Sequence, residues 1–208
     1  MAVLISYKVT SDKCKVRVPH MGVSIEDYRK NLTPDLKYMT NFTIEVFLDD
    51  DSQKIMDFGL LRGVYFEAEA LFSNELSFTA LCAMASPGVY DMAVAVADMQ
   101  GNIKPSICRP EHNMAYIKEM VNEEHFRGNK AGQYLLNNLA PLLSHSLNLR
   151  PHVCIVLPYP QAKAPGGALP GAAENVAAEQ PYHIGFYEKA GYTKLDGSDY
   201  MYKKFGQP

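Results

Sequence analysis

The sequence has few cysteines, and they form no recognisable metal or redox motif. The four cysteines lie far apart and include no Cys-x-x-Cys pair: Cys14, Cys82, Cys108 and Cys154. This spacing argues against a zinc finger or a dithiol redox site and favours reduced, largely buried thiols. The six histidines are also scattered. The closest approach to metal-ligand spacing, His145 and His152, straddles the expected helix end at Arg150-Pro151, so we expect no metal site.

Long apolar runs are absent as well. Charged residues interrupt every apolar stretch before about 18 residues, the length that spans a bilayer. The segment Met1–Ile5 carries no basic leader. We therefore expect no membrane span, no signal peptide and a cytoplasmic protein.

The chain has no excess of basic charge. Its 20 Lys and Arg residues stand against 23 Asp and Glu, which gives a formal net charge of −3. Since this charge creates no broad basic field, we expect no nucleic-acid partner. Neutral substrates and cationic amines fit such a chain better.

What the sequence does contain is enough apolar material for one core and a mixture of helix and strand patterns. The chain has 208 residues, of which 47% are hydrophobic, and this favours one domain. Expected strands are Val3–Val9, Lys15–Pro19, Thr43–Leu48, Ala115–Val121, His152–Leu157 and Tyr200–Phe205, with a hairpin of Met92–Ala97 and Ile103–Cys108. Expected helices are a short one opened by Ser24, Tyr65–Met84 with a break near Ser73-Asn74 left open, Ala131–Leu149 and Tyr182–Lys189.

The segment 158–181 differs from the rest because it is rich in Pro, Gly and Ala. Such a composition excludes a regular strand or a long helix throughout, and long connections of this kind usually serve a function. Two interpretations remain open. The segment is either a lid near a site or a surface arm for a homo-oligomer or an assembly partner.

The most informative stretch is a glycine-bearing loop that leads into an amphipathic helix, Gln133–Leu139. The first N–H groups of a helix lack intrahelical acceptors, and the helix dipole adds partial positive charge there, so this junction favours phosphate oxygens. The candidate anion-binding residues are Arg127, Gly128, Asn129, Lys130, Ala131 and Gly132.

A second motif, Phe186–Tyr192 with the sequence Phe-Tyr-Glu-Lys-Ala-Gly-Tyr, follows downstream. The order of the two motifs resembles the GNAT superfamily of acyl-CoA-dependent N-acetyltransferases. The resemblance implies an α/β (α+β) fold with a central mixed, mostly antiparallel twisted sheet and helices on both faces. It also implies a single domain over 1–208, with 1–60 as an atypical N-terminal elaboration.

The resemblance implies acetyl-CoA as co-substrate and no metal. The family's pyrophosphate loop reads Gln/Arg-x-x-Gly-x-Gly/Ala; Arg127 and Gly132 match it, and Lys130 replaces a glycine. This lysine either adds a charge for phosphate or obstructs close approach of the backbone. Family resemblance further implies that Met120 and Val121 present backbone groups to pantetheine and the acetyl carbonyl where the sheet splays.

Two side chains are the candidate catalytic groups. Tyr187 stands where many family members have a tyrosine that protonates the departing CoA sulfur; its alternative role is that of an aromatic residue covering the sheet. Glu119 is the candidate base for the amine because it lies on the strand nearest in sequence to the implied thioester. Gln180 and His183 stand where the family usually has Asn and Ala, which weakens the match.

The sequence therefore predicts an N-acetyltransferase that moves an acetyl group from acetyl-CoA to an unidentified amine by direct attack. Cys108 and Cys154 have no evident histidine partner, so a covalent acyl-enzyme route is disfavoured. A GNAT-like fold that has lost catalysis and serves as a structural or binding component of an assembly is the alternative. A nucleotide-binding α/β protein that uses the same loop is a third interpretation.

Overall fold

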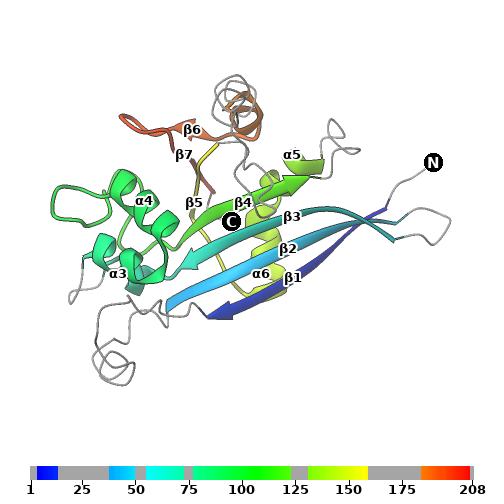
Figure 1. The fold of residues 1–208 in the computed structure, drawn as a ribbon, viewed down its shortest axis with the longest axis horizontal. Coiled ribbons are helices and arrows are strands. Elements are labelled where there is room, and N and C mark those ends of the chain that lie inside the picture. Colours follow the sequence, from blue (N-terminus) through cyan, green and yellow to red (C-terminus); the bar gives the residue numbers. More distant parts are fainter. Residues whose placement is uncertain are drawn as a thin grey trace, which may run out of the picture.

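One seven-stranded sheet organises the molecule (Figure 1). The computed structural model describes residues 4–13, 38–49, 55–72, 77–122, 131–158 and 184–206. In chain order, the strands are β1 (Leu4–Lys13), β2 (Met39–Asp49), β3 (Ile55–Phe66), β4 (Met114–Asn122), β5 (Val153–Val156), β6 (Thr193–Lys194) and β7 (Met201–Lys204).

The strand order across the sheet is β1-β2-β3-β4-β5-β7-β6. Strands β4 and β5 run parallel, and every other neighbouring pair of described strands is antiparallel. The predicted mixed, mostly antiparallel sheet is therefore confirmed, and the arrangement is consistent with a GNAT-like fold. Within residues 1–60, β1, β2 and the beginning of β3 extend this sheet beyond β4.

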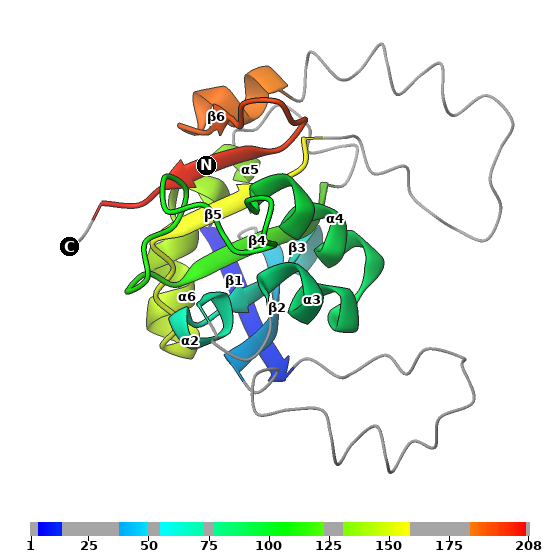
Figure 2. The ribbon, with the colours of Figure 1, turned by 90° about the vertical axis from the view of Figure 1, so that its left-hand side faces the viewer.

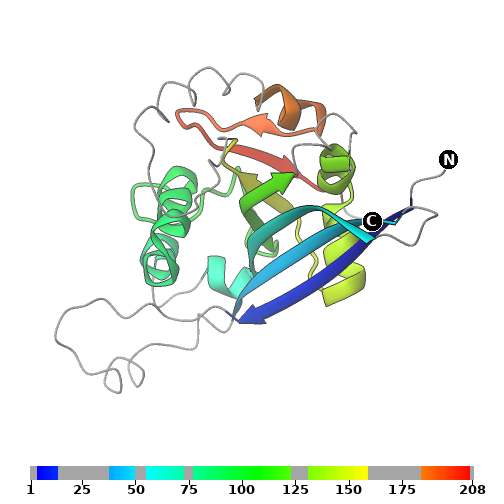
Figure 3. The same cartoon turned by 45° about the vertical axis from the view of Figure 1, so that its right-hand side comes forward.

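Helices cover both faces of the sheet, as predicted (Figure 3). The helices are α2 (Ala68–Leu71), α3 (Phe78–Ala85), α4 (Pro87–Val96), α5 (Ala131–Asn137) and α6 (Leu139–Leu147), and residues 184–189 form a further one. We call the side that carries α3 and α4 the α4 face, and the side that carries α5, α6 and 184–189 the α6 face. Each face has its own apolar cluster, so the middle of the sheet, around β4 and β5, is buried on both sides (Figure 2).

The predicted helix Tyr65–Met84 is wrong at its beginning. Tyr65 and Phe66 are the last residues of β3, where they pair with both β2 and β4. The helical part begins with α2 and resumes at α3, whose Ser77 side chain accepts a hydrogen bond from the N–H of Ala80. The place of the expected break at Ser73-Asn74 lies outside the described residues.

The predicted hairpin is also wrong, because its first half is the helix α4. Ser86 caps this helix by accepting from the N–H of Val89 at 3.3 Å, and Pro87 occupies its first turn. The turn itself is present. Asp98 Oδ1 accepts from two backbone N–H groups, Gly101 has a φ of 81°, and an isolated bridge pairs Ala97 with Ile103.

The remaining elements follow the sequence closely. The expected strands near β1, β2, β4, β5 and β7 are present, and residues 184–189 are helical. The expected helix Ala131–Leu149 is divided into α5 and α6 at Asn138, and Asn148 ends it in the left-handed conformation with a φ of 56°. The expected strand Lys15–Pro19 and the helix opened by Ser24 lie outside the described residues.

No described helix combines the length and the apolar character that crossing a bilayer requires.

Candidate functional site

A bulge in β4 determines which way its last side chains point. Strand β4 pairs with β3 in one register from Met114 to Ile117 and in another from Glu119 to Asn122, so Lys118 is the extra residue. Before the bulge, Ala115 and Ile117 belong to the α6-face cluster; after it, Met120 does. The extra residue thus reverses the alternation and turns Glu119 toward the α4 face, which is what a bulge does to a strand.

Gly63 permits this bulge. It lies in β3 directly opposite Ile117, where the register changes. A Cβ atom at this position would overlap the Phe42 ring and would lie 2.5 Å from the carbonyl oxygen of Tyr116. Only glycine fits so close an approach without displacing its neighbours.

The parallel strands β4 and β5 part immediately after this point. Their pairing runs from Met114 with Val153 to Ile117 with Val156, where β5 ends. Strand β4 continues to Asn122 and stays paired with β3 throughout. Met120 and Val121 therefore lie in the part of β4 beyond the β5 pairing. The splay of the sheet that the resemblance implies stays a prediction.

The candidate anion-binding loop is described only at its end. Arg127, Gly128, Asn129 and Lys130 lie outside the described residues, as do Gln180 and His183. Helix α5 begins at Ala131, and Gly132 is buried in its first turn. The roles assigned to these residues stay predictions.

Tyr187 is enclosed by other side chains. It is 6% exposed and belongs to the α6-face cluster. Its ring meets those of Phe186 and Tyr192 edge-on, at centroid distances of 5.3 and 5.5 Å. Burial, and secondarily the neighbouring Cys154, raises the pKa of its hydroxyl above the usual value. The phenol keeps its proton at neutral pH, and the raised pKa makes it a weaker acid toward a thiolate than an ordinary tyrosine.

Glu119 lies on the other face and has an ionic partner. Its Oε2 accepts a hydrogen bond from Arg62 Nη1 at 2.9 Å, and both side chains are partly exposed. A carboxylate in this position reaches solvent, but it must release or share the guanidinium to take a proton from an amine. Tyr187 and Glu119, the two candidate catalytic groups, thus lie on opposite faces of the sheet.

Three residues beside Tyr187 were not singled out as a group from the sequence. Cys154 is fully buried, and burial raises its pKa to about 12, so the thiol is a poor nucleophile at neutral pH. Lys203 donates to the carbonyl of Ala190 at 2.7 Å and so fastens the 184–189 helix end to β7. Tyr192 has a buried hydroxyl whose pKa is raised by burial and by its interaction with the Cys154 thiol, but it makes no hydrogen bond of good geometry with any described residue.

The only sequence signal for Lys203 was the alternation of Tyr200–Phe205, which placed this residue on a strand that follows the Phe186–Tyr192 motif in the chain. The register of β7 with β5, which sets Lys203 opposite Cys154, appears only in the fold.

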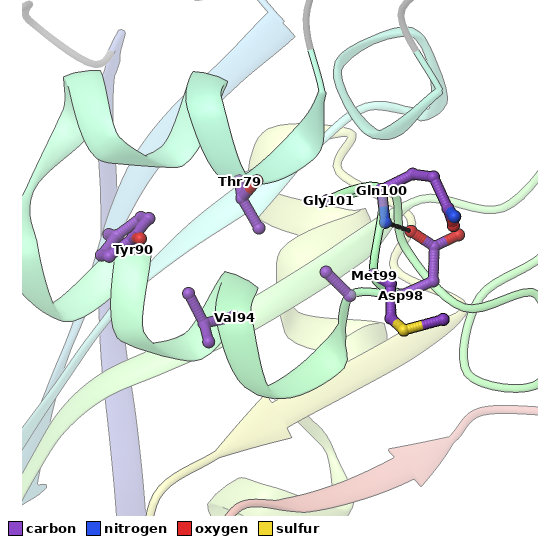
Figure 4. A pocket seen from close by; sticks show the side chains of 8 residues that line it. Thr79, Tyr90, Val94, Asp98, Met99, Gln100 and Gly101 are labelled. Atoms are coloured by element: carbon purple, nitrogen blue, oxygen red, sulfur yellow. Dashed lines mark hydrogen bonds between the residues drawn. The ribbon is translucent and has the colours of Figure 1, made fainter.

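An open surface pocket of about 290 Å³ lies away from these residues, between α3, α4 and the turn at 97–101 (Figure 4). Tyr90, Val94 and Met99 line it and are themselves exposed. None of the predicted site residues that the structure describes takes part. Within the described ranges, no cluster of three or more His, Cys, Asp or Glu side chains is arranged to hold a metal ion.

Comparisons with known proteins give little. No protein-family model matches the sequence. No curated protein matches it either. Among solved structures, the chain is similar to one described as "The crystal structure of KacTA-DNA complex", with a TM-score of 0.40, 9% identity, and coverage of 97% of this chain and 93% of that chain.

The description of that structure names DNA, and this corrects the expectation of no nucleic-acid partner. A formal net charge of −3 is a sum over the chain. It describes neither how charge is distributed over the surface nor what a second protein contributes to a complex. The exclusion of nucleic acid from net charge alone was therefore wrong.

Proposed function

We propose that the chain is an N-acetyltransferase of GNAT type that binds acetyl-CoA where β4 parts from β5 and transfers the acetyl group to an amine. One observation carries the proposal: β4 continues to Asn122 after its pairing with β5 has ended at Ile117. Successive residues of a strand direct their backbone N–H and C=O groups to opposite edges, so one of the two neighbours Met120 and Val121 turns these groups toward the edge where no described strand pairs. Such groups suit the amides of an extended pantetheine arm and the oxyanion of a thioester addition.

The transfer is a direct attack. The amine nitrogen, after losing a proton to Glu119 or to water, adds to the thioester carbon, and β4 N–H groups stabilise the resulting oxyanion. The C–S bond then breaks, the CoA thiolate takes the proton of Tyr187, and the proton that the nitrogen loses as the amide forms passes through water and restores the phenol. No acyl-enzyme forms, which agrees with the buried, protonated state of Cys154. The phosphates of CoA would lie on Arg127–Gly132.

Isothermal titration calorimetry with acetyl-CoA and with CoA tests the binding step. The parent protein should bind both, and Gly132→Glu should weaken binding at least about tenfold because a carboxylate would face phosphate. Gly88→Glu is the control for the added charge, since Gly88 is the second residue of α4 and lies exposed in open space on the other face. Circular dichroism checks that both variants fold.

Lys130→Gly adds a second test that leaves the buried Gly132 unchanged. Glycine restores the family's pattern, so binding should stay or become tighter if the lysine side chain obstructs the loop. Absence of acetyl-CoA binding by both the parent and Lys130→Gly would contradict the proposed function.

A second candidate is a GNAT-like fold that serves as a structural or binding component without catalysis. The observation that favours it is the state of the two candidate groups: Tyr187 is enclosed by protein, and Glu119 is held by Arg62. Binding of acetyl-CoA without turnover on any amine in a broad amine panel would favour this candidate over the first.

A further inference from the structure

Strand β1 forms one edge of the sheet that the described residues make, and it is long for an edge strand. It runs for 10 residues, Leu4–Lys13, and no described strand pairs with its outer side (Figures 1 and 3). Lys8, Thr10, Ser11 and Asp12 are exposed. An edge of this length offers a row of backbone donors and acceptors to another strand.

We propose that this edge pairs with the β1 edge of a second copy of the chain, so that two sheets join into one across a two-fold axis. The two β1 strands then run antiparallel. Because the axis is perpendicular to the sheet, each face of one copy continues into the same face of the other. Residues that lie directly opposite each other must therefore point to the same face. Because side chains alternate between faces along a strand, this holds only when the two-fold axis passes between one residue and the same residue of the second copy. An axis placed between two successive residues would set side chains of opposite faces against each other.

The charges of β1 select one of these registers. Centring the axis on Thr10 sets Lys8 opposite Asp12 of the second copy, and symmetry repeats the pair. Centring it on Lys8 or on Asp12 sets like charges opposite each other, which is destabilising. Centring it on Val9 or Ser11 creates no pair of opposite charges across the axis. Thr10 is thus the centre that charge complementarity favours.

The neighbouring strand supports the same arrangement. Glu45 lies opposite Lys8 in the β1–β2 register, and its Oε2 is 2.9 Å from Lys8 Nζ. In the proposed dimer, Lys8 lies between Glu45 of its own copy and Asp12 of the other. This places one positive charge between two negative ones along a row of the joined sheet. The face with Val9, which packs against the α6-face cluster, remains covered by its own helix.

The test uses two charge reversals in the full chain, Lys8→Asp and Asp12→Lys. Each variant replaces both opposite-charge pairs by like-charge pairs, so each should raise the dimer Kd by about tenfold or more. A mixture of the two variants should dimerise again, because one copy then has acidic side chains at both positions and the other copy has basic side chains at both. Sedimentation velocity over a range of concentrations measures all three samples.

Glu45→Gln is the control. It removes the partner of Lys8 within the chain but leaves the edge unchanged, so the dimer should persist. Three results would overturn the proposal: a parent protein that is monomeric at every concentration, a dimer that is insensitive to the single reversals, or a mixture that stays monomeric. The first result would also arise if another segment of the chain, or only a different protein, occupied the edge.

Discussion

The two faces of the sheet differ in how they hold their candidate catalytic side chain. On the α6 face, Tyr187 is fixed by packing against aromatic rings and is almost fully enclosed. On the α4 face, Glu119 is partly exposed and fixed by one ion pair with Arg62. The Tyr187 side chain therefore contributes to the stability of the fold, whereas the orientation of the Glu119 carboxylate depends on the bulge in β4. A change at Tyr187 should act first on folding, and a change at Glu119 first on chemistry.

The largest effect should come from removing the Tyr187 ring. Tyr187→Ala leaves a cavity within the α6-face cluster and should lower the free energy of unfolding by about 3 kcal/mol or more. Tyr187→Phe keeps the ring and should lower it far less. Urea unfolding followed by circular dichroism measures both variants, and equal losses in the two would show that packing does not fix this residue.

Gly63→Ala should disturb the bulge that separates the two faces. The added Cβ would overlap the Phe42 ring and crowd the Tyr116 carbonyl oxygen, so we expect a loss of about 2 kcal/mol. The matched control is Gly88→Ala, where nothing lies within 4 Å of the added atom. A Gly63→Ala protein as stable as the control would contradict the assigned role of this glycine.

Tyr192→Phe should stabilise the α6 face. The variant removes a buried hydroxyl that makes no hydrogen bond of good geometry with any described residue, and its interaction with the Cys154 thiol is weak because a thiol is a poor donor and acceptor, so the free energy of unfolding should rise by about 1 kcal/mol. Thermal unfolding monitored by circular dichroism shows this as a higher Tm. A clear decrease would mean that the hydroxyl has a partner in the folded protein.

The smallest effect on stability should come from the α4 face. Arg62→Ala removes a partly exposed ion pair and should change the free energy of unfolding by less than about 1 kcal/mol. If the proposed function holds, the same change should alter the rate of acetylation, because Glu119 loses the guanidinium that holds its carboxylate. A kcat and KM identical to those of the parent protein would remove Glu119 from the proposed chemistry.

The sequence predicted the strands whose patterns are local. Strands β4 and β5 were found because a compact apolar run identifies each of them. The end of β3 was missed because both of its faces are buried there: Leu61 and Tyr65 belong to one cluster, Val64 and Phe66 to the other. Such a strand has no alternation of apolar and polar residues, and its end was therefore assigned to a helix.

Helix α4 shows the opposite error. Its alternating alanines and valines resemble a strand, although Val89, Met92, Ala93 and Val96 are the buried residues and recur at helical intervals. Ser86-Pro87 was interpreted as the end of one helix, but it also begins the next. The Arg62–Glu119 pair could not be foreseen, because it depends on β3 and on the register around a bulge.

The measurement that tests the account most directly is hydrogen–deuterium exchange with and without saturating acetyl-CoA. If the cofactor lies where β4 parts from β5, exchange should slow in the segment after Ile117 and at the beginning of α5, and should stay unchanged in α3 and α4. Binding that leaves the end of β4 unprotected, or that protects α3 and α4 instead, would contradict the proposed site.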